Sequence, residues 1–173
     1  MAKREARDIA EGHDLAGKTV VLTGGSSGIG AETTKALAMT GANVVITARN
    51  VEAGRGTIGE MDALGSGRHL LLPLDLSVPD DVHRFADDLL AQLDSIDVLI
   101  ANAGVSDTPH ARNTLGFDMR FATNHLGHFL LAHALLGAIE PDAKSRKRVF
   151  NVVVECLQNL YHHNANLRAE GDA

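Results

Sequence analysis

The feature that most constrains the fold is a regular alternation of short apolar runs with longer amphipathic segments. Five apolar runs have the length of a strand, at residues 18–23, 43–48, 68–74, 97–103 and 148–154. Most of them carry consecutive apolar residues instead of alternating apolar and polar ones, which is typical of strands buried on both faces. The pattern therefore predicts one open, parallel sheet.

Four segments between these runs predict helices, at residues 29–39, 51–64, 80–93 and 113–139. Ser77 is expected to cap the third of them, and Pro79 to lie in its first turn. Crossovers between parallel strands are right-handed and place helices on both faces of the sheet. The sequence thus predicts a doubly wound, three-layer αβα fold of the Rossmann type with strand order 3-2-1-4-5.

Length and composition indicate one soluble domain over residues 1–173, with 1–14 as an N-terminal extension and 155–173 as a divergent tail. The net charge of −6 argues against a nucleic-acid partner. A single cysteine, Cys156, excludes a disulfide framework and favours a reducing, cytoplasmic location. The longest apolar stretch, 126–139, is too short for a membrane span.

The stretch TGGSSGIG, residues 23–30, joins the first predicted strand to the first predicted helix. A helix N-terminus offers unpaired backbone N–H groups and a partial positive charge, so it stabilises a phosphate group. Glycines there permit a sharp turn and a close approach of the ligand, and the serine hydroxyls add donors. The predicted binding residues of this loop are Gly24, Ser26, Ser27, Gly28, Ile29 and Gly30. The alternative is a plain glycine-rich turn.

The end of the second predicted strand, in ITARN, indicates which dinucleotide such a loop would hold. An acidic residue at this position bonds the ribose 2′-hydroxyl of NAD, whereas an arginine suits the 2′-phosphate of NADP. The chain has Arg49 and Asn50 here and no acid, so NADP(H) is favoured over NAD. The alternative is that Arg49 is only a solvated residue at a strand end.

Together these residues resemble the short-chain dehydrogenase/reductase superfamily. TGGSSGIG fits the TGxxxGIG cofactor loop of that family. Asp75 and Leu76 resemble the pair that holds the adenine ring, although an aspartate before a helix is also a common turn residue. Asn102, Ala103 and Gly104 resemble the NAG motif beside the cofactor.

The resemblance extends from residue 14 to residue 152 and implies reversible hydride transfer between NADP(H) and a carbonyl or alcohol substrate. Asn124 lies where the family has its structural and catalytic asparagine; from chemistry alone it is equally a core amide satisfied by the backbone. The sequence NHLGHFLL is most similar to that of the retinol dehydrogenase and protochlorophyllide reductase branch. In the family this long helix is commonly an oligomer contact, so a homo-oligomer through residues 113–139 is expected.

The resemblance fails after Asn151. The family needs a serine and a Tyr-x-x-x-Lys pair, but Val153 and Val154 stand at the serine positions, and Ala165 lies four residues after Tyr161. The later strands of the family fold have no counterpart, which suggests a truncated or altered reading frame. We therefore expect impaired catalysis. The alternatives are an inactive cofactor-binding module or subunit, or a non-functional fragment.

Three histidines, His125, His128 and His133, lie in the long predicted helix. No motif such as CxxC or HExxH accompanies them, so no metal site is expected. We interpret them as surface or packing residues. The sequence does not indicate a substrate.

Overall fold

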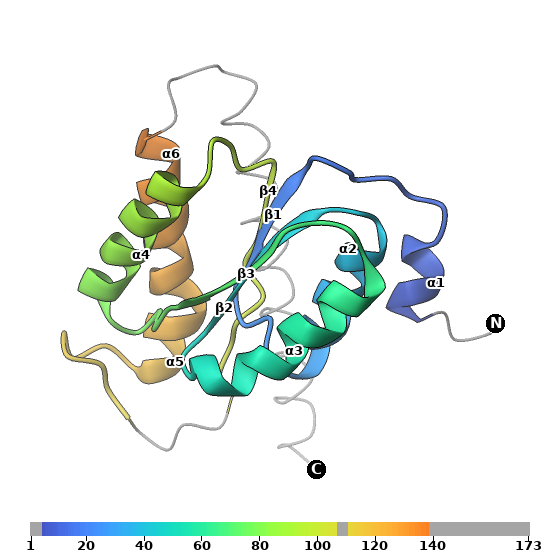
Figure 1. Ribbon diagram of the computed structural model, residues 1–173. Coiled ribbons are helices and arrows are strands. Elements are labelled where there is room, and N and C mark those ends of the chain that lie inside the picture. The colour runs from blue at the N-terminus through green and yellow to red at the C-terminus, as the bar shows by residue number, and fades with distance from the viewer. Residues whose placement is uncertain (1–4, 107–110, 139–173) are drawn as a thin grey trace, which may run out of the picture.

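The computed structural model describes residues 5–106 and 111–138. Within them four parallel strands form one sheet in the order β3-β2-β1-β4, which confirms the doubly wound fold class (Figure 1). The strands are β1 (Thr19–Leu22), β2 (Asn43–Ala48), β3 (His69–Pro73) and β4 (Val98–Ile100). The predicted fifth strand, 148–154, and the predicted tail, 155–173, lie outside the described residues.

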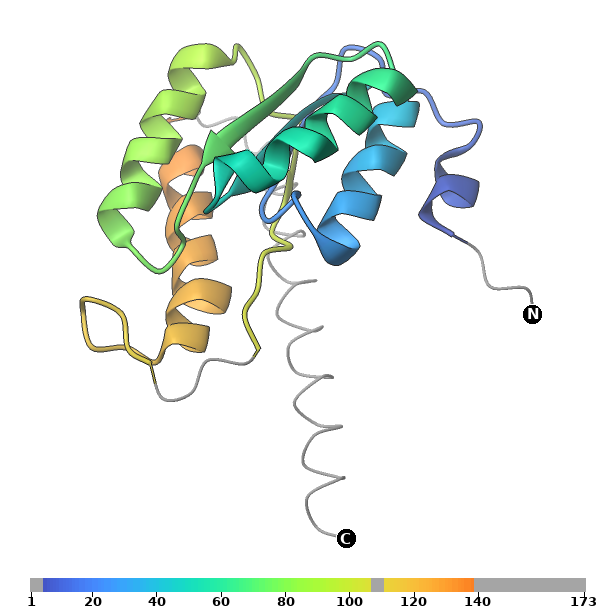
Figure 2. The same ribbon diagram turned by 60° about the horizontal axis from the view of Figure 1, so that its bottom comes forward.

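Helices cover both faces of the sheet, as predicted. Figures 1 and 2 show α2 (Gly28–Met39) and α3 (Val51–Leu64) on one face, and α4 (Pro79–Gln92) and α6 (His128–Ala138) on the other. A short helix within the predicted N-terminal extension, α1 (Ala6–Ala10), packs beside α2. The result is a three-layer αβα arrangement.

The register of the strands divides the core into two clusters. Because neighbouring side chains on a strand point to opposite faces, Val20 joins Val44 and Ile46 under α2 and α3, whereas Val21 joins Val45 and residues of α4 and α6. Val21 and Val45 are at most 1% exposed. Both clusters are mainly aliphatic, which suits a chain with only 3% aromatic residues. Burial on both faces is why these strands read as continuous apolar runs.

Two predicted helix starts differ from the structure. The prediction that Ser77 caps α4 is wrong, because Val78 is the N-cap residue and makes no side-chain cap bond. The Ser77 hydroxyl instead donates to the carboxylate of Asp75 at 2.7 Å. Pro79 does open the helix, as expected, since the missing N–H of a proline has no helical partner at that position anyway.

The predicted helix 113–139 begins later than expected, at α5 (Met119–Phe121). Asp118 sets this start, because its side chain accepts from the N–H groups of Arg120 and Phe121. Asn113, the predicted first residue, holds a turn by accepting from the N–H of Phe117 at 3.0 Å. The chain then passes through a π-helical turn, η1 (Ala122–Gly127), into α6. Single π-turns often accompany functional sites.

Candidate functional site

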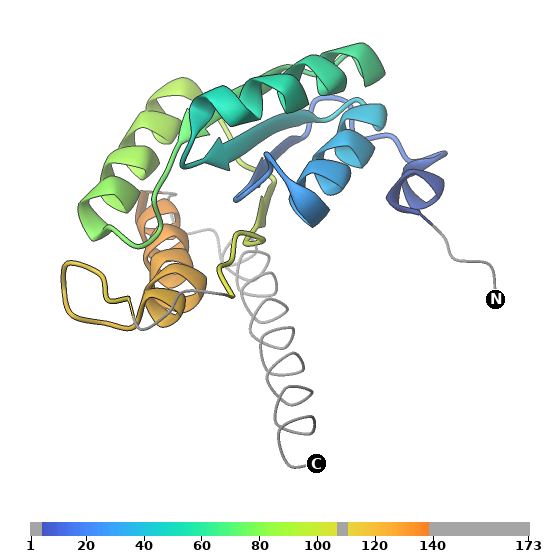
Figure 3. The same cartoon turned by 90° about the horizontal axis from the view of Figure 1, so that it is seen from below.

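A cavity of about 360 Å³ opens at the edge of the sheet where the parallel strands end. Figure 3 views the molecule from this side. Ligands of open α/β sheets bind at this edge, in the crevice where strand order reverses. The cavity is lined by Gly24, Ser26, Ser27, Ile29, Gly30, Thr47, Ala48, Arg49, Leu74, Leu76, Asn102, Ala103, Gly104, Val105 and Thr123.

The first turn of α2, which follows the glycine-rich loop, has backbone N–H groups without a described acceptor. No described residue accepts a hydrogen bond from the N–H groups of residues 28–30; the first bonded one nearby is that of Ala31, which donates to Ser27. Gly28 has a φ of 54°, and a Cβ there would meet nothing within 4 Å. The space in front of this helix N-terminus is therefore open, and its free donors can hold an anionic group.

Gly30 has a different reason to be glycine. A Cβ on Gly30 would lie 2.1 Å from the Gly24 carbonyl oxygen and 2.7 Å from Nδ2 of Asn102. The first turn of α2 can therefore pack against the strand ends only without a side chain at this position. Gly24, with a φ of 69°, completes the turn. The loop and the end of β4 thus form one continuous wall.

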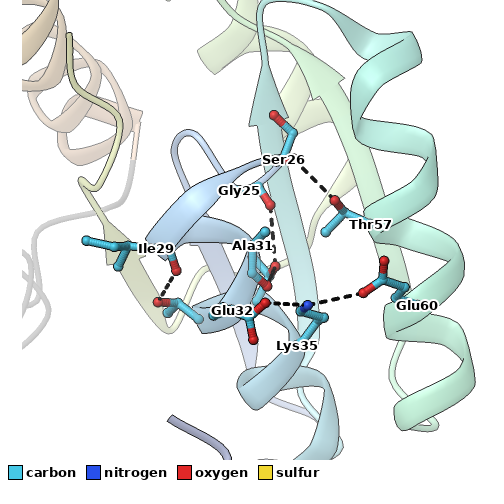
Figure 4. Close-up of polar contacts among 10 residues, drawn as sticks. Gly25, Ser26, Ile29, Ala31, Glu32, Lys35, Thr57 and Glu60 are labelled. Atoms are coloured by element: carbon cyan, nitrogen blue, oxygen red, sulfur yellow. Dashed lines mark hydrogen bonds and ion pairs between the residues drawn. The ribbon is translucent and has the colours of Figure 1, made fainter. Parts of the chain in front are cut away.

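Two carbonyl groups of the glycine loop, those of Gly25 and Ser26, contact side-chain hydroxyl groups of α2 and α3. The hydroxyl of Thr34 in α2 lies 3.4 Å from the Gly25 carbonyl oxygen, and the hydroxyl of Thr57 in α3 lies 3.4 Å from that of Ser26 (Figure 4). These contacts favour a loop conformation in which the carbonyls point back toward the helices. The N–H groups of residues 28–30 remain available to a ligand in the cavity.

A charged cluster joins α2 to α3 below these contacts. The Lys35 ammonium lies 2.5 Å from Glu32 and 3.1 Å from Glu60 (Figure 4). The hydrogen bond from Lys35 lowers the pKa of Glu32, and the hydrogen bond to Glu32 raises the pKa of Lys35. The cluster holds together the two helices that carry the loop contacts.

At the end of β2, Arg49 lines the cavity and is exposed. Among the residues that the structure describes, its guanidinium has no hydrogen-bond or ion-pair partner. Asn50 does not line the cavity; its side chain caps α3 by accepting from the N–H of Ala53 at 3.3 Å. A free cation therefore stands at this rim, next to a residue with a local structural role.

After β3, the cavity is lined by apolar side chains and not by the predicted carboxylate. Leu74 and Leu76 line it, whereas Asp75 does not. One carboxylate oxygen of Asp75 accepts from both the N–H and the hydroxyl of Ser77, at 2.9 and 2.7 Å. The Leu76 carbonyl oxygen lies 2.2 Å from where a Cβ on Gly127 would be, so η1 packs closely behind this wall.

After β4, Asn102 ties its loop to the glycine loop. Its Nδ2 donates to the carbonyl oxygens of Thr23 and Gly24 at 2.9 and 3.3 Å. The buried hydroxyl of Thr23 accepts in return from the N–H groups of Asn102 and Ala103, both at 3.0 Å. The motif Asn102–Gly104 is thus fixed against the start of the TGGSSGIG stretch.

The π-turn η1 closes the same side of the cavity. Asn124 does not line the cavity: its Oδ1 accepts from the N–H of Val105 at 2.8 Å and its Nδ2 donates to the Val105 carbonyl at 3.0 Å. Asn124 therefore meets the polar groups of a cavity-lining residue, which agrees with the interpretation as a backbone-satisfied amide. His128, 6% exposed, contacts both Thr23 and the Asn124 carbonyl. Burial lowers the pKa of His128; the bond to the Asn124 carbonyl opposes this and His125 adds to it.

The structure brings most of the predicted site residues together around one cavity. Four do not line it, namely Gly28, Asn50, Asp75 and Asn124. Five lining residues were not predicted, namely Thr47, Ala48, Leu74, Val105 and Thr123. The first four lie within two positions of predicted residues at strand ends, so the strand boundaries were a usable signal. Thr123 reaches the cavity through the π-turn, for which the sequence gives no comparable signal. Among the described residues no group of three His, Cys, Asp or Glu side chains could hold a metal ion.

The sheet, the glycine loop and its free helix N-terminus define the class of doubly wound dinucleotide-binding folds. The family model for short chain dehydrogenase matches residues 18–164. The chain belongs to this family of oxidoreductases, which confirms the resemblance seen in its motifs.

Individual relatives agree with this assignment. The chain is 40% identical to retinol dehydrogenase 11 of Homo sapiens over 151 residues, 87% of this chain and 48% of the relative. An uncharacterized protein from Mycobacterium paratuberculosis of known structure has 37% identity and a TM-score of 0.65, over 79% of this chain and 47% of that one. A metagenomic short-chain oxidoreductase in complex with NADP has 30% identity and a TM-score of 0.64, over 86% of this chain and 79% of that one.

The chain spans about half the length of the curated relatives that it matches, 48% in the case of retinol dehydrogenase 11. Within residues 5–106 and 111–138, no helix has the length and apolar character that a bilayer crossing requires.

Proposed function

We propose that the chain binds NADP(H) at this cavity, as an oxidoreductase of the short-chain type. The observation that carries the proposal is the open helix N-terminus of α2, whose N–H groups at residues 28–30 have no acceptor among the described residues. These groups would hold the diphosphate bridge. The nicotinamide, when bound, would supply or accept a hydride. Asn102–Gly104 would form the wall beside that ring, and Leu74 and Leu76 would flank the adenine.

The preference for NADP(H) over NAD rests on Arg49. Its guanidinium is exposed, lines the cavity and has no described partner, and the strand end carries no acidic residue that would bond a free 2′-hydroxyl. A guanidinium can bind a phosphate through two parallel hydrogen bonds. The NADP complex of a related oxidoreductase supports the same choice.

The substitution Arg49→Ala tests this preference. We expect the Kd of NADPH, measured by calorimetry, to rise by about tenfold to a hundredfold, because a charge-assisted hydrogen bond contributes roughly 1.5–3 kcal/mol. The Kd of NADH should change little. Arg55→Ala is the matched control, since Arg55 is also exposed but pairs with Glu52 on α3. Equal losses for NADPH and NADH in Arg49→Ala would contradict the 2′-phosphate role.

We further propose that the 173-residue chain transfers hydride poorly. Val153 and Val154 cannot polarise a carbonyl group, and Ala165 cannot lower the pKa of Tyr161. A tyrosine with a pKa near ~10 is a weak proton shuttle at neutral pH. On this proposal Asn124 acts by holding Val105, and its catalytic role stays a prediction. The second candidate function is therefore an inactive cofactor-binding module or subunit.

A turnover assay separates the two candidates. NADPH absorbance is followed against a panel of aldehydes and ketones, retinal included, with thermal melting of the chain with and without NADPH in parallel. Background turnover with a raised Tm indicates a binding module, because a ligand specific for the folded state must stabilise it. Turnover well above background would contradict the proposed impairment. No shift in Tm at saturating NADPH and NADH would contradict binding and leave the non-functional fragment.

A homo-oligomer through residues 119–138, the described helical part of the predicted segment 113–139, is a further part of the proposal. Phe121 and Phe129 on this segment are 47% and 58% exposed, an unusual exposure for large apolar side chains. The ring of His125 stacks on the ring of Phe121, with 5.2 Å between the ring centroids, and extends this surface. Light scattering tests this proposal by comparing the mass of the wild type with that of the double variant Phe121→Ser, Phe129→Ser. A monomeric wild type would contradict the proposal. So would an oligomeric wild type whose mass the double variant keeps.

A further inference from the structure

His128 is a buried titratable residue to which the proposed function gives no task. It lies at the start of α6 and is 6% exposed. Nε2 of its ring lies 2.8 Å from the hydroxyl oxygen of Thr23. Nδ1 lies 3.1 Å from the carbonyl oxygen of Asn124. The ring thus connects the end of β1 with the π-turn.

The partners of Thr23 determine which hydrogens lie in these contacts. Its hydroxyl oxygen has two lone pairs, and the N–H groups of Asn102 and Ala103 both donate to it at 3.0 Å. The hydroxyl hydrogen must therefore point elsewhere. Nε2 of His128, at 2.8 Å, is the near acceptor, whereas the Ile100 carbonyl oxygen is 3.5 Å away. The Nε2 atom then carries no hydrogen.

The second ring nitrogen leads to the same tautomer. A carbonyl oxygen can only accept, so Nδ1 of His128 must carry the hydrogen that faces Asn124. All four contacts are satisfied by the neutral Nδ1–H tautomer and by no other form of the ring. A protonated ring would aim a third N–H donor at a hydroxyl oxygen that has only two lone pairs.

We propose that His128 is a positioning residue for the wall Asn102–Ala103. By accepting the hydroxyl hydrogen of Thr23, it directs both lone pairs of that oxygen to the two N–H groups of the wall. The contact of His128 with the Asn124 carbonyl also fixes the π-turn η1. In this turn, the side-chain amide of Asn124 bonds to the backbone of Val105. The relevance to ligand binding rests on the proposed function, because this wall would lie beside the nicotinamide.

The tautomer is measured first, on the ligand-free wild-type chain with ¹⁵N-labelled histidine. His128→Gln identifies the His128 signals by their loss. We expect the ¹⁵N shifts at neutral pH to show hydrogen on Nδ1 and none on Nε2. A hydrogen on Nε2, or rapid averaging between the two tautomers, would overturn the proposal. This readout does not depend on any dinucleotide.

Variants then test the positioning effect. His128→Leu and Thr23→Val each remove the contact, and we expect each to speed hydrogen exchange of the Asn102 and Ala103 amides and to weaken NADPH binding by about tenfold. His128→Gln keeps an acceptor near Thr23, so its effect on both measurements should stay below about threefold. His133→Leu is the control, because His133 is an exposed residue of the same helix. It should match the wild type.

The double variant and the readout without ligand separate the possible failures. Because His128 acts on the wall through the Thr23 hydroxyl, the double variant should lose no more than Thr23→Val alone. Unchanged amide exchange in His128→Leu and Thr23→Val, or equal damage from His128→Gln and His128→Leu, would overturn the positioning role. Wild-type protein that shows the expected tautomer and exchange but binds no NADPH would overturn the proposed function instead, and the link between His128 and the wall would stand.

Discussion

The two sides of the cavity use their polar groups in opposite ways. On the side of the glycine loop, the N–H groups of residues 28–30 and the guanidinium of Arg49 have no partner among the described residues. On the side of β4 and η1, the polar groups of Thr23, Asn102, Asn124 and His128 bond to one another or to nearby backbone. One side is built to receive a ligand, and the other to keep its shape.

Solvent access explains why the chain can tolerate this difference. Gly28 and Ile29 are exposed, so their free N–H groups can bond to water until a ligand replaces it. Thr23 is 0% exposed and His128 is 6% exposed, so their polar atoms must find partners within the protein. A substitution on the first side should therefore mainly affect binding. A substitution on the second side should affect binding and stability together.

The largest effect is expected where the two sides meet, at Gly30. Gly30→Ala places a Cβ 2.1 Å from the Gly24 carbonyl oxygen and 2.7 Å from Nδ2 of Asn102. Because these are backbone and wall atoms, we expect the free energy of unfolding in urea to fall by about 2–3 kcal/mol. NADPH binding, followed by calorimetry, should weaken by more than about a hundredfold.

Gly59→Ala is the control for this change, since Gly59 is exposed in α3 and a Cβ there meets nothing within 4 Å. It should leave binding intact and raise stability by up to about 1 kcal/mol, because alanine is the better helix former. Normal NADPH affinity in Gly30→Ala would show that the two sides do not share this contact.

An intermediate effect is expected for Asn124→Ala. The change removes both side-chain hydrogen bonds to Val105, and we expect stability to fall by about 1–2 kcal/mol. Asn43→Ala is the matched control, because its side chain bonds the N–H of Arg68 at the opposite end of the sheet. The two variants should lose comparable stability in urea, but only Asn124→Ala should weaken NADPH binding, by about threefold to tenfold. Equal affinities would contradict the role of Asn124 in holding the wall.

The smallest effect is a pH dependence of stability. Burial lowers the folded-state pKa of His128 below 6.5, so below pH 6.5 the unfolded chain binds more protons at this residue. Stability is then lost as the pH falls from 6.5 toward the folded-state pKa, by at most about 1.4 kcal/mol per pH unit. His125 is the titratable neighbour that acts on His128, and α4 contributes apolar side chains to the same core.

Thermal melting between about pH 7.5 and pH 5.5 measures this dependence. The wild type should lose more stability over that range than His128→Gln, whereas His133→Leu should follow the wild type. Identical curves for the wild type and His128→Gln would show that His128 does not contribute to the acid sensitivity of the chain.

The sequence predicts the binding side of the cavity better than the shape-holding side. TGGSSGIG and Arg49 are recognisable because each follows an apolar run and uses residue types that local chemistry demands. On the other side only the motif at residues 102–104 is recognisable in this way. The four described strands follow from burial on both faces, which leaves a pattern in the chain itself. The start of the predicted helix 113–139 was wrong, because the caps at Asn113 and Asp118 compete within a few residues.

The shape-holding side depends on pairs that are distant in the chain. Ser77 resembles a helix cap, but its hydroxyl donates a hydrogen bond to the carboxylate of Asp75 instead. His128 reads as an ordinary packing histidine, and nothing local connects it to Thr23, 105 positions away. Gly127 is required by the Leu76 carbonyl, which only the packing of η1 brings near. Such contacts arise from tertiary structure and leave no periodic signal.

The distance along the chain between Thr23 and His128 also orders events during protein synthesis. The carbonyl groups of Gly25 and Ser26 have their last described partner once Thr57 has been made, 31 positions after Ser26. The Gly24 carbonyl needs Asn102, 78 positions later, and the hydroxyl of Thr23 needs His128, 105 positions later. In a nascent chain that leaves the ribosome from its N-terminus, the helix contacts of residues 25 and 26 can therefore form well before the back of the cavity can close.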